Sequence, residues 1–340
     1  MRSLFSAQLV NDPFGDPGLY VDFLTERRAF LVDLGDIHAL APRHLLRVTH
    51  LFVTHTHMDH FYGFDYFVRV LLGRDKTVHL YGPPGFIENV EGRLSSYTWN
   101  LIHLNREVLD LRVHEWDGGP LLRGASFSSR NAFKKRPLAS RLLEGNLLCE
   151  AGGVQVRAAV LDHKIPVLGF RIDEPPRLNI CRERLGRLGL KPGPWLRELK
   201  EALSEGLPPS TPIELPSGEK RPLEELRAQI VKTTPGWSVG YLTDLIYSRE
   251  NIAAAKRLLS GVHTLFIEAR FAHRDLELAE EHHHLTAWQA GDIARRLGAE
   301  RVVPFHFSPR YRGREEEQLR EVERGFRGEP LEPNGRGGVV

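Results

Sequence analysis

Short apolar runs alternate along the chain with longer segments of helical periodicity. The short runs are rich in β-branched and aromatic residues and are bounded by Gly, Pro or Asp, which is typical of strands. We predict strands over residues 20–23, 29–34, 48–53, 78–81, 154–161, 239–242, 264–268 and 301–304. Strands mixed with helices in this order favour a layered α/β fold.

Four segments have the spacing of amphipathic helices. We predict helices over residues 64–72, 86–94, 249–259 and 286–297. The last is the best defined, because Thr286 is a suitable N-cap and Gly298 a suitable stop. Trp288, Ile293 and Leu297 supply much of its apolar stripe.

One stretch interrupts this alternation. Residues 174–234 carry nine prolines, and Pro235 lies just beyond them. Because proline cannot donate to the ladder of a central sheet, the stretch is expected to be an inserted arm or lid between two core strands. The rest of residues 1–340 then forms one domain. A surface insertion without a role in the site is the alternative.

Composition narrows the class of protein. A chain of 340 residues that is 41% hydrophobic can bury a substantial core. Two cysteines, Cys149 and Cys181, are too few for a disulfide framework or a cysteine zinc cluster, and they favour the cytoplasm. No run of 18 apolar residues is present, so we predict no membrane-spanning helix. The net charge of +2 argues neither for nor against nucleic acid.

Basic residues gather in three stretches, at about residues 130–141, 182–200 and 310–314. Such runs usually form solvated surface. They would make a phosphate-binding surface only if they converge around one site.

Candidate chemistry begins with His-Thr-His-Met-Asp-His at residues 55–60, one residue after the apolar run 51–53. In an extended segment side chains two apart point the same way, so His55 and His57 can bind one ion. Asp59 and His60 fall where the next helix begins and face the same cleft, so they can serve a second ion. Imidazole and carboxylate ligands suit zinc, manganese or iron. The alternative is a few surface histidines near a turn.

Further ligand-type residues follow other apolar runs. Taken singly, a His or Asp after a strand is more often a cap or turn residue than a ligand. As a set they complete a binuclear site. We predict that one ion is held by His55, His57 and His163, the other by Asp59, His60 and His306, with Asp244 as the bridge.

These motifs together resemble the metallo-β-lactamase fold and, within it, the ribonuclease Z family. The match rests on residues 55–60, 161–166, 241–244, 266–271, 284–287 and 305–311. Glu268 and His284 are 16 positions apart, and His284 and His306 are 22 apart, as in that family. The resemblance implies a four-layer αββα sandwich and two divalent metal ions, zinc first, with manganese or iron as alternatives.

The same resemblance implies an activity and roles for single residues. The activity is a phosphodiesterase that removes the 3′ trailer from precursor tRNA with a metal-activated hydroxide. Asp59 would both bind metal and orient the attacking water, and Asp33 would support the ligand histidines. His284, polarised by Glu268, would be the general acid. Without the family spacing, His284 would be only one of three surface histidines.

Substrate contacts are expected in two places. Lys191, Gly193 and Pro194 resemble part of the family's tRNA-gripping arm. Arg310 and Ser308 follow the ligand His306; Arg310 could bind phosphate or could equally pair with a carboxylate. A homodimer is also implied by the resemblance.

The chain departs from the family at several positions. Residues 5–19 lack the family's glycine-rich opening and basic loop, Met58 replaces a glycine and Arg270 replaces a threonine. These departures keep open a second hypothesis, a hydrolase of the same fold that acts on a small phosphodiester or ester. A third, non-enzymatic hypothesis is a metal-stabilised binding protein.

Overall fold

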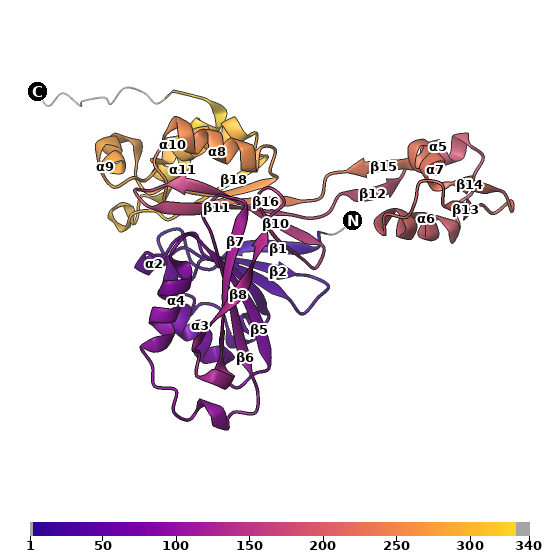
Figure 1. The fold of residues 1–340 in the computed structure, drawn as a ribbon. Helices are drawn as coiled ribbons and strands as arrows, with labels where there is room; N and C mark the ends of the chain where they lie inside the picture. The colour runs from indigo at the N-terminus through magenta and orange to yellow at the C-terminus, as the bar shows by residue number, and fades with distance from the viewer. Residues whose placement is uncertain (1–2, 331–340) are drawn as a thin grey trace, which may run out of the picture. The chain divides into compact units, whose positions relative to one another are not determined.

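Two β-sheets face each other in the first of two units of the chain (Figure 1). The computed structural model describes residues 3–330. The first unit takes the described residues of Met1–Asp173 and Trp237–Val340, and the second takes Glu174–Gly236.

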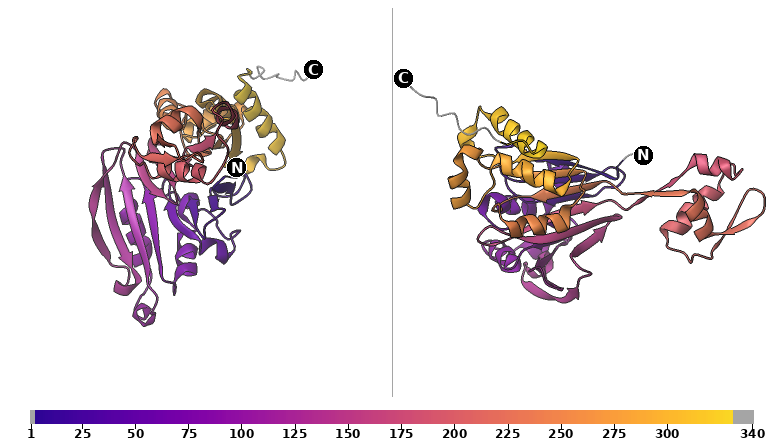
Figure 2. Two further views of the ribbon diagram at one scale, coloured as in Figure 1. Left: turned by 90° about the vertical axis from the view of Figure 1, so that its right-hand side faces the viewer. Right: turned by 90° about the horizontal axis from the view of Figure 1, so that it is seen from above.

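The first sheet has eight strands in sequence order: β1 (Phe5–Leu9), β2 (Leu19–Phe23), β3 (Ala29–Val32), β4 (Val48–Phe52), β5 (Lys76–Gly82), β6 (Leu109–Trp116), β7 (Leu121–Ser128) and β8 (Lys135–Leu142). Strands β3 to β6 pair in parallel, and the left-hand view of Figure 2 shows the strands of this sheet side by side.

The second sheet has six strands in the order β18-β17-β16-β11-β10-β9. These are β9 (Leu147–Ala151), β10 (Val154–Asp162), β11 (Pro166–Asp173), β16 (Ser238–Leu242), β17 (Thr264–Glu268) and β18 (Arg301–Phe305). Strands β16, β17 and β18 are parallel, so their carboxyl ends lie at one edge.

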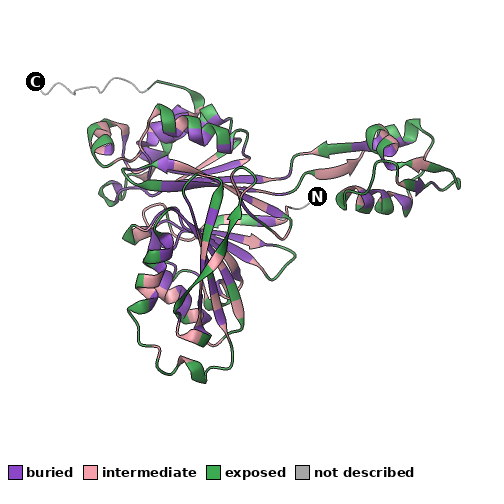
Figure 3. Cartoon of the chain, in the orientation of Figure 1, coloured by how far each residue is buried: buried purple, intermediate pink, exposed green. Residues whose placement is uncertain are grey.

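Apolar side chains fill the space between the sheets. Phe52 and Tyr81 of the first sheet and Phe170 and Tyr241 of the second belong to this buried cluster. Figure 3 shows buried residues along the strands of both sheets. Each fully buried side chain of this size contributes about 1.5–3 kcal/mol to the free energy of folding, so this layer holds the strand ends at its edge in place.

Helices cover the outer faces and complete the four layers. The first sheet carries α1 (Pro42–Leu45), α2 (Met58–Phe61), α3 (Phe64–Leu71) and α4 (Phe86–Ser95). The second carries α8 (Arg249–Leu259) and α10 (Ala287–Leu297), and α9 (Leu276–Glu281) and α11 (Glu315–Arg327) complete this side. Gly291 and Gly325 let α10 and α11 touch, since a Cβ at Gly291 would lie 2.0 Å from a backbone oxygen of α11. The predicted αββα sandwich is confirmed.

The second unit has its own small core. Strand β12 (Arg177–Ile180) pairs with β15 (Val231–Thr234), and β13 (Pro212–Glu214) pairs with β14 (Lys220–Pro222). Helices α5 (Arg182–Arg187), α6 (Trp195–Ser204) and α7 (Leu223–Ile230) bury Leu185, Trp195, Leu199 and Leu226 together. In sequence the unit lies between β11 and β16, which pair with each other.

The predicted strands and helices are present, and helix α10 has the expected cap. The Thr286 hydroxyl accepts a hydrogen bond from the Gln289 backbone N–H, and the Gln289 side-chain oxygen accepts one from the Thr286 backbone N–H. Gly298 ends the helix in the left-handed region. Strands β1, β6 to β9, β11 and the short strands β12 to β15 of the second unit were not predicted. Strand β8 is exposed along nearly its whole length, so the basic run at residues 135–142 lacks the alternation that marks a half-buried strand.

No helix in the described range 3–330 is long and apolar enough to cross a membrane.

Candidate metal centre

The predicted ligands come together where strands of both sheets end. His55 follows β4, His163 follows β10, Asp244 follows β16 and His306 follows β18. Asp244 and His306 have positive φ angles of 50° and 61°, a conformation that costs free energy for residues other than glycine. Such strained positions concentrate at functional sites, where the surrounding structure holds them.

The first cluster contains His55, His57, His163 and Asp244. One ligand-type atom from each lies within 4.8 Å of the others. The His55 and His57 rings are 4.4 Å apart, as the two-residue spacing predicted. Three imidazoles and one carboxylate form a set that suits zinc.

The second cluster contains Asp59, His60 and His306. The His306 Nε2 atom lies 3.3 Å from Asp59 Oδ2, and His60 Nε2 lies 3.9 Å from the same oxygen. Helix α2 carries Asp59 and His60, so the second cluster joins the start of that helix to the end of β18.

The Asp244 carboxylate lies between the two clusters. Its Oδ2 atom is 3.5 Å from both His55 Nε2 and His163 Nε2. Its Oδ1 atom is 3.3 Å from His60 Nε2 and 3.1 Å from His306 Nδ1. Each oxygen therefore faces a different cluster, which is the arrangement that a bridging carboxylate needs.

Outer hydrogen bonds orient the ligand rings. His163 Nδ1 donates to the backbone oxygen of His283 over 2.7 Å, which leaves Nε2 free to bind a cation. His60 Nδ1 is 3.0 Å from Asp33 Oδ2. His55 Nδ1 is 3.1 Å from the Thr54 hydroxyl, which donates to Asp33. Asp33 therefore supports ligand histidines from behind.

The chemistry of the cluster fits a cation. Among the described residues, the buried Nε2 atoms of His55 and His60 make no hydrogen bond. Burial lowers the pKa of His55 to about 2, so its ring is neutral. Burial alone would raise the pKa of Asp244, but His60 and His306 outweigh it and hold that pKa well below its ordinary value. Buried carboxylates kept ionised beside free imidazole nitrogens suit divalent metal ions.

Glu268 and His284 form a pair beside these two clusters, and with Asp244 and His306 they make a third group of ligand-type atoms within 4.8 Å of one another. His284 Nδ1 is 2.8 Å from Glu268 Oε2. Burial raises the pKa of Glu268, but His284 outweighs burial and lowers it to about 2, so Glu268 accepts from Nδ1–H of His284. Glu268 Oε1 also accepts from the backbone N–H groups of Leu245 and Leu285. The Glu268 carboxylate thus holds the backbone of Leu245, next to Asp244, and of Leu285, next to His284.

The predicted substrate residues are divided between the two units. Ser308 and Arg310 follow the predicted ligand His306, and the Arg310 guanidinium lies 5.6 Å from the centre of the Phe271 ring. Among the described residues Arg310 forms no ion pair, which leaves its charge available. Lys191, Gly193 and Pro194 lie in the second unit, in the turn before α6.

Three residues of the site were missed by sequence reasoning. Thr54 and Tyr241 both donate to Asp33, and Asp16 accepts from the backbone N–H of Asp36. Asp16 lies near enough to Asp59 and His306 to interact with both electrostatically, and burial raises its pKa. Thr54 could have been found from its place between a strand and His55. Tyr241 sits in an apolar run that predicts only core.

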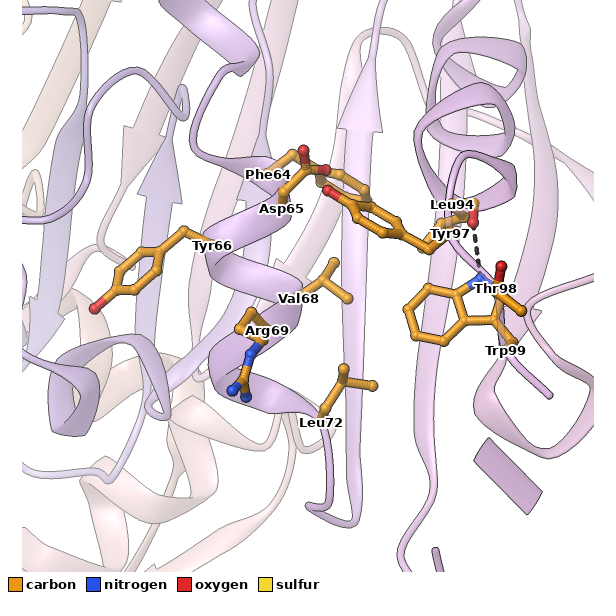
Figure 4. Close-up of a pocket in the computed structure, with 10 residues that line it drawn as sticks. All are labelled: Phe64, Asp65, Tyr66, Val68, Arg69, Leu72, Leu94, Tyr97, Thr98 and Trp99. Carbon is orange, nitrogen blue, oxygen red and sulfur yellow. Dashed lines mark hydrogen bonds between the residues drawn. The ribbon is translucent and has the colours of Figure 1, made fainter. Parts of the chain in front are cut away.

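A separate pocket of about 430 Å³ lies between α3 and the segment after α4 (Figure 4). Phe64, Val68, Leu94, Tyr97 and Trp99 give it a largely apolar lining. Within residues 3–330 no group of metal-type ligands falls in this pocket. The candidate chemistry therefore belongs to the clusters at the strand ends.

Known proteins resemble the chain at the level of fold. A family model described as a beta-lactamase superfamily domain matches residues 204–307. The metallo-beta-lactamase fold protein YhfI from Bacillus subtilis superimposes with a TM-score of 0.53 at 14% identity, covering 95% of this chain and 93% of that one. A long form RNase Z from yeast gives 0.51 at 12% identity, covering 90% of this chain and 38% of that one. These likenesses support the metallo-β-lactamase fold.

Relatives in sequence identify the family within this fold. A ribonuclease Z from Deinococcus radiodurans is 36% identical over 315 residues, which cover 91% of this chain and 92% of the relative. A ribonuclease Z from Geobacillus kaustophilus is 29% identical and covers 88% of this chain and 84% of the relative. With this identity over nearly the full length of both chains, the protein belongs to the ribonuclease Z family.

Proposed function

We propose that this protein is a metal-dependent endoribonuclease that removes the 3′ trailer from precursor tRNA. The observation that carries the proposal is the pair of ligand clusters that share Asp244, in a chain of the ribonuclease Z family. The fold alone would not assign the substrate.

We propose His55, His57 and His163 as ligands of one ion, Asp59, His60 and His306 as ligands of the other, and Asp244 as the bridge. Two divalent ions bound there, zinc in our proposal, would neutralise the charge of phosphate oxygens. They would also lower the pKa of a bound water molecule, so that hydroxide is available near neutral pH. Zinc is proposed because imidazole dominates the ligand set; manganese and iron accept the same ligands.

The residues of the chain then divide the proton transfers. Asp59 lies at the cluster with a partly exposed side chain, where it can orient the attacking water as well as bind metal. His284 donates its Nδ1–H to Glu268. As the general acid it would carry a second proton on Nε2, give that proton to the leaving oxygen and be left as the neutral ring. Since Glu268 is buried and fixed by two backbone N–H groups, it keeps His284 in one orientation.

The second unit is the proposed RNA contact. Arg182, Arg184, Arg187 and Lys191 are exposed, and within the described residues none of them forms an ion pair. Free cationic side chains on a folded unit can bind RNA phosphates. Arg310, beside the last ligand, is the proposed phosphate contact near the metals.

Cleavage assays test the function directly. The metal-loaded protein is incubated with a precursor tRNA that carries a 3′ trailer and with a bis-aryl phosphodiester. We expect one cut at the trailer junction that requires divalent metal. Hydrolysis of the small ester alone would overturn the tRNA assignment, and hydrolysis of neither substrate at full metal occupancy would support the metal-stabilised binding protein.

Charge variants test the RNA contact. Replacing Arg184 and Lys191 with Gln should raise KM for precursor tRNA. It should also reduce the slope of the logarithm of the RNA-binding constant against the logarithm of the salt concentration by about 0.7–0.9 per lost phosphate contact. Turnover of the small ester should not change. Lys220→Gln is a matched control, because Lys220 lies in the same unit but pairs with Glu214.

Two further predictions belong with this function. The family resemblance implies a homodimer, which light scattering of the purified protein tests.

The two free cysteines, with Cys149 buried, fit the cytoplasm.

A further inference from the structure

Tyr241 joins the two sheets directly beneath the metal clusters. It is fully buried on β16, three positions before Asp244. Its hydroxyl donates to Asp33 Oδ2 over 3.1 Å, and Asp33 lies at the end of β3 in the other sheet. A hydrogen bond between buried groups 208 positions apart fixes the separation of the two strand ends.

Asp33 in turn contacts His60, a proposed ligand of the second cluster. The oxygen that accepts from Tyr241 also lies 3.0 Å from His60 Nδ1. The other oxygen accepts from the backbone N–H and the hydroxyl of Thr54. The Tyr241 hydroxyl therefore holds the carboxylate oxygen that orients His60.

The ring of Tyr241 supports a second ligand of the same cluster. It stacks on Phe305, with centroids 5.0 Å apart and planes 28° apart. Phe305 directly precedes His306. His60 and His306 both belong to the cluster with Asp59, so one tyrosine supports two of its three ligands.

The first cluster is supported less directly by Tyr241. His163 donates to the His283 backbone oxygen, which Tyr241 does not touch in any hydrogen bond of the described residues. His55 bonds to the Thr54 hydroxyl, which donates to Asp33, so Tyr241 reaches His55 only through two intermediate groups. The larger influence of Tyr241 should therefore fall on the ion of Asp59, His60 and His306.

We infer that Tyr241 is a positioning residue for the second metal ion, acting through Asp33 on His60 and through Phe305 on His306. The inference rests on the proposed binuclear centre. It assigns to a core tyrosine a selective role in the affinity for one of two adjacent ions.

Tyr241→Phe tests the role by removing only the hydroxyl. Zinc is titrated into the metal-free protein and followed by calorimetry, and ¹¹³Cd NMR of the cadmium-loaded protein separates the two ions. We expect one ion to bind about 10-fold more weakly and one cadmium resonance to move, since loss of a support behind a ligand typically costs 10–100-fold in metal affinity. The other ion should lose clearly less affinity, because Tyr241 reaches His55 only through Asp33 and Thr54.

Tyr247→Phe is the matched control. The Tyr247 hydroxyl also donates to a carboxylate, that of Asp292, but neither residue belongs to a group of metal-type ligands among the described residues. Both variants should lower the unfolding midpoint of the metal-free protein to a similar extent, and only Tyr241→Phe should change zinc affinity.

Phe305→Leu provides an independent variant, because it removes the stacked ring and leaves the hydroxyl bond in place. It should weaken the same ion. Equal weakening of both ions, or unchanged affinity in Tyr241→Phe and Phe305→Leu, would overturn the inference. Cleavage of precursor tRNA by the wild-type protein is scored separately, so a failure of this inference is distinguishable from a failure of the proposed function.

Discussion

Two groups of histidines begin on or just after strand β4 and differ in what they can do. His55, His57 and His60 stand at the end of β4 and converge with Asp244. His50, on the same strand, stacks on His79 of β5, and His114 of β6 continues the stack. Among the described residues this second group joins no cluster of metal-type ligands.

The stacked group shows what imidazoles do without carboxylates. The ring centroids of His50 and His79 are 5.1 Å apart and those of His79 and His114 are 6.0 Å apart, with nearly parallel planes. Burial, helped by nearby charged residues such as Arg28 and Arg141, lowers the pKa of His50 to about 3 and that of His114 to about 4. These rings are packed as neutral aromatic groups.

The difference teaches that position on the strand decides the chemistry. Side chains in the middle of adjacent strands stand parallel, so their nitrogens cannot converge. Side chains at strand ends can turn towards one point, and here ionised Asp244 and Asp59 face them. Convergence with carboxylates, and not the number of histidines, marks the candidate metal centre.

Removing the shared carboxylate should have the largest effect. Asp244→Ala takes a ligand oxygen from both clusters, so we expect fewer than two bound ions per chain by elemental analysis and loss of RNA cleavage. Two ions retained in the variant would refute the bridge. Asp292→Ala is the control, because Asp292 is equally buried but pairs with Arg295 and Arg296.

Removing the proposed proton donor should have a smaller effect. His284→Ala should leave both ions bound and slow turnover by roughly 10²-fold or more, the usual contribution of a general acid. Single-turnover cleavage of precursor tRNA measures this. The exposed neighbour His282 is the control, and a rate for His284→Ala equal to that of His282→Ala would assign His284 to the surface run instead.

Changing the stacked group should leave the metals untouched. In the folded protein the pKa values of His50 and His114 lie below the ordinary 6.5, so the unfolded chain binds more protons as the pH falls. The stability that the neutral rings provide is therefore complete above about pH 6.5. It is lost progressively as the pH falls from there to the folded-state pKa, about 4 for His114 and about 3 for His50.

His114→Phe should reduce this acid sensitivity, because phenylalanine keeps the stack and cannot be protonated. Urea unfolding of the metal-free protein at pH 7 and pH 4.5 measures the difference. An equal loss of stability in variant and wild type would contradict the assignment, as would a change in the number of bound ions.

Much of the site could be predicted from sequence because ligands follow strands. His55, His163, Asp244 and His306 each come just after an apolar run, and the run itself fixes where the ligand lies. Tyr241 could not be predicted, since its hydroxyl meets Asp33 across 208 positions and its surroundings indicate only core. Strand β8 was missed because its exposed, basic sequence has no apolar face.

Electron paramagnetic resonance of the manganese-loaded protein tests the central claim most directly. If Asp244 bridges the two clusters, two Mn²⁺ ions should lie roughly 3.5–4 Å apart and give the signal of a spin-coupled pair. A spectrum of isolated Mn²⁺ ions at full occupancy would contradict a shared binuclear centre.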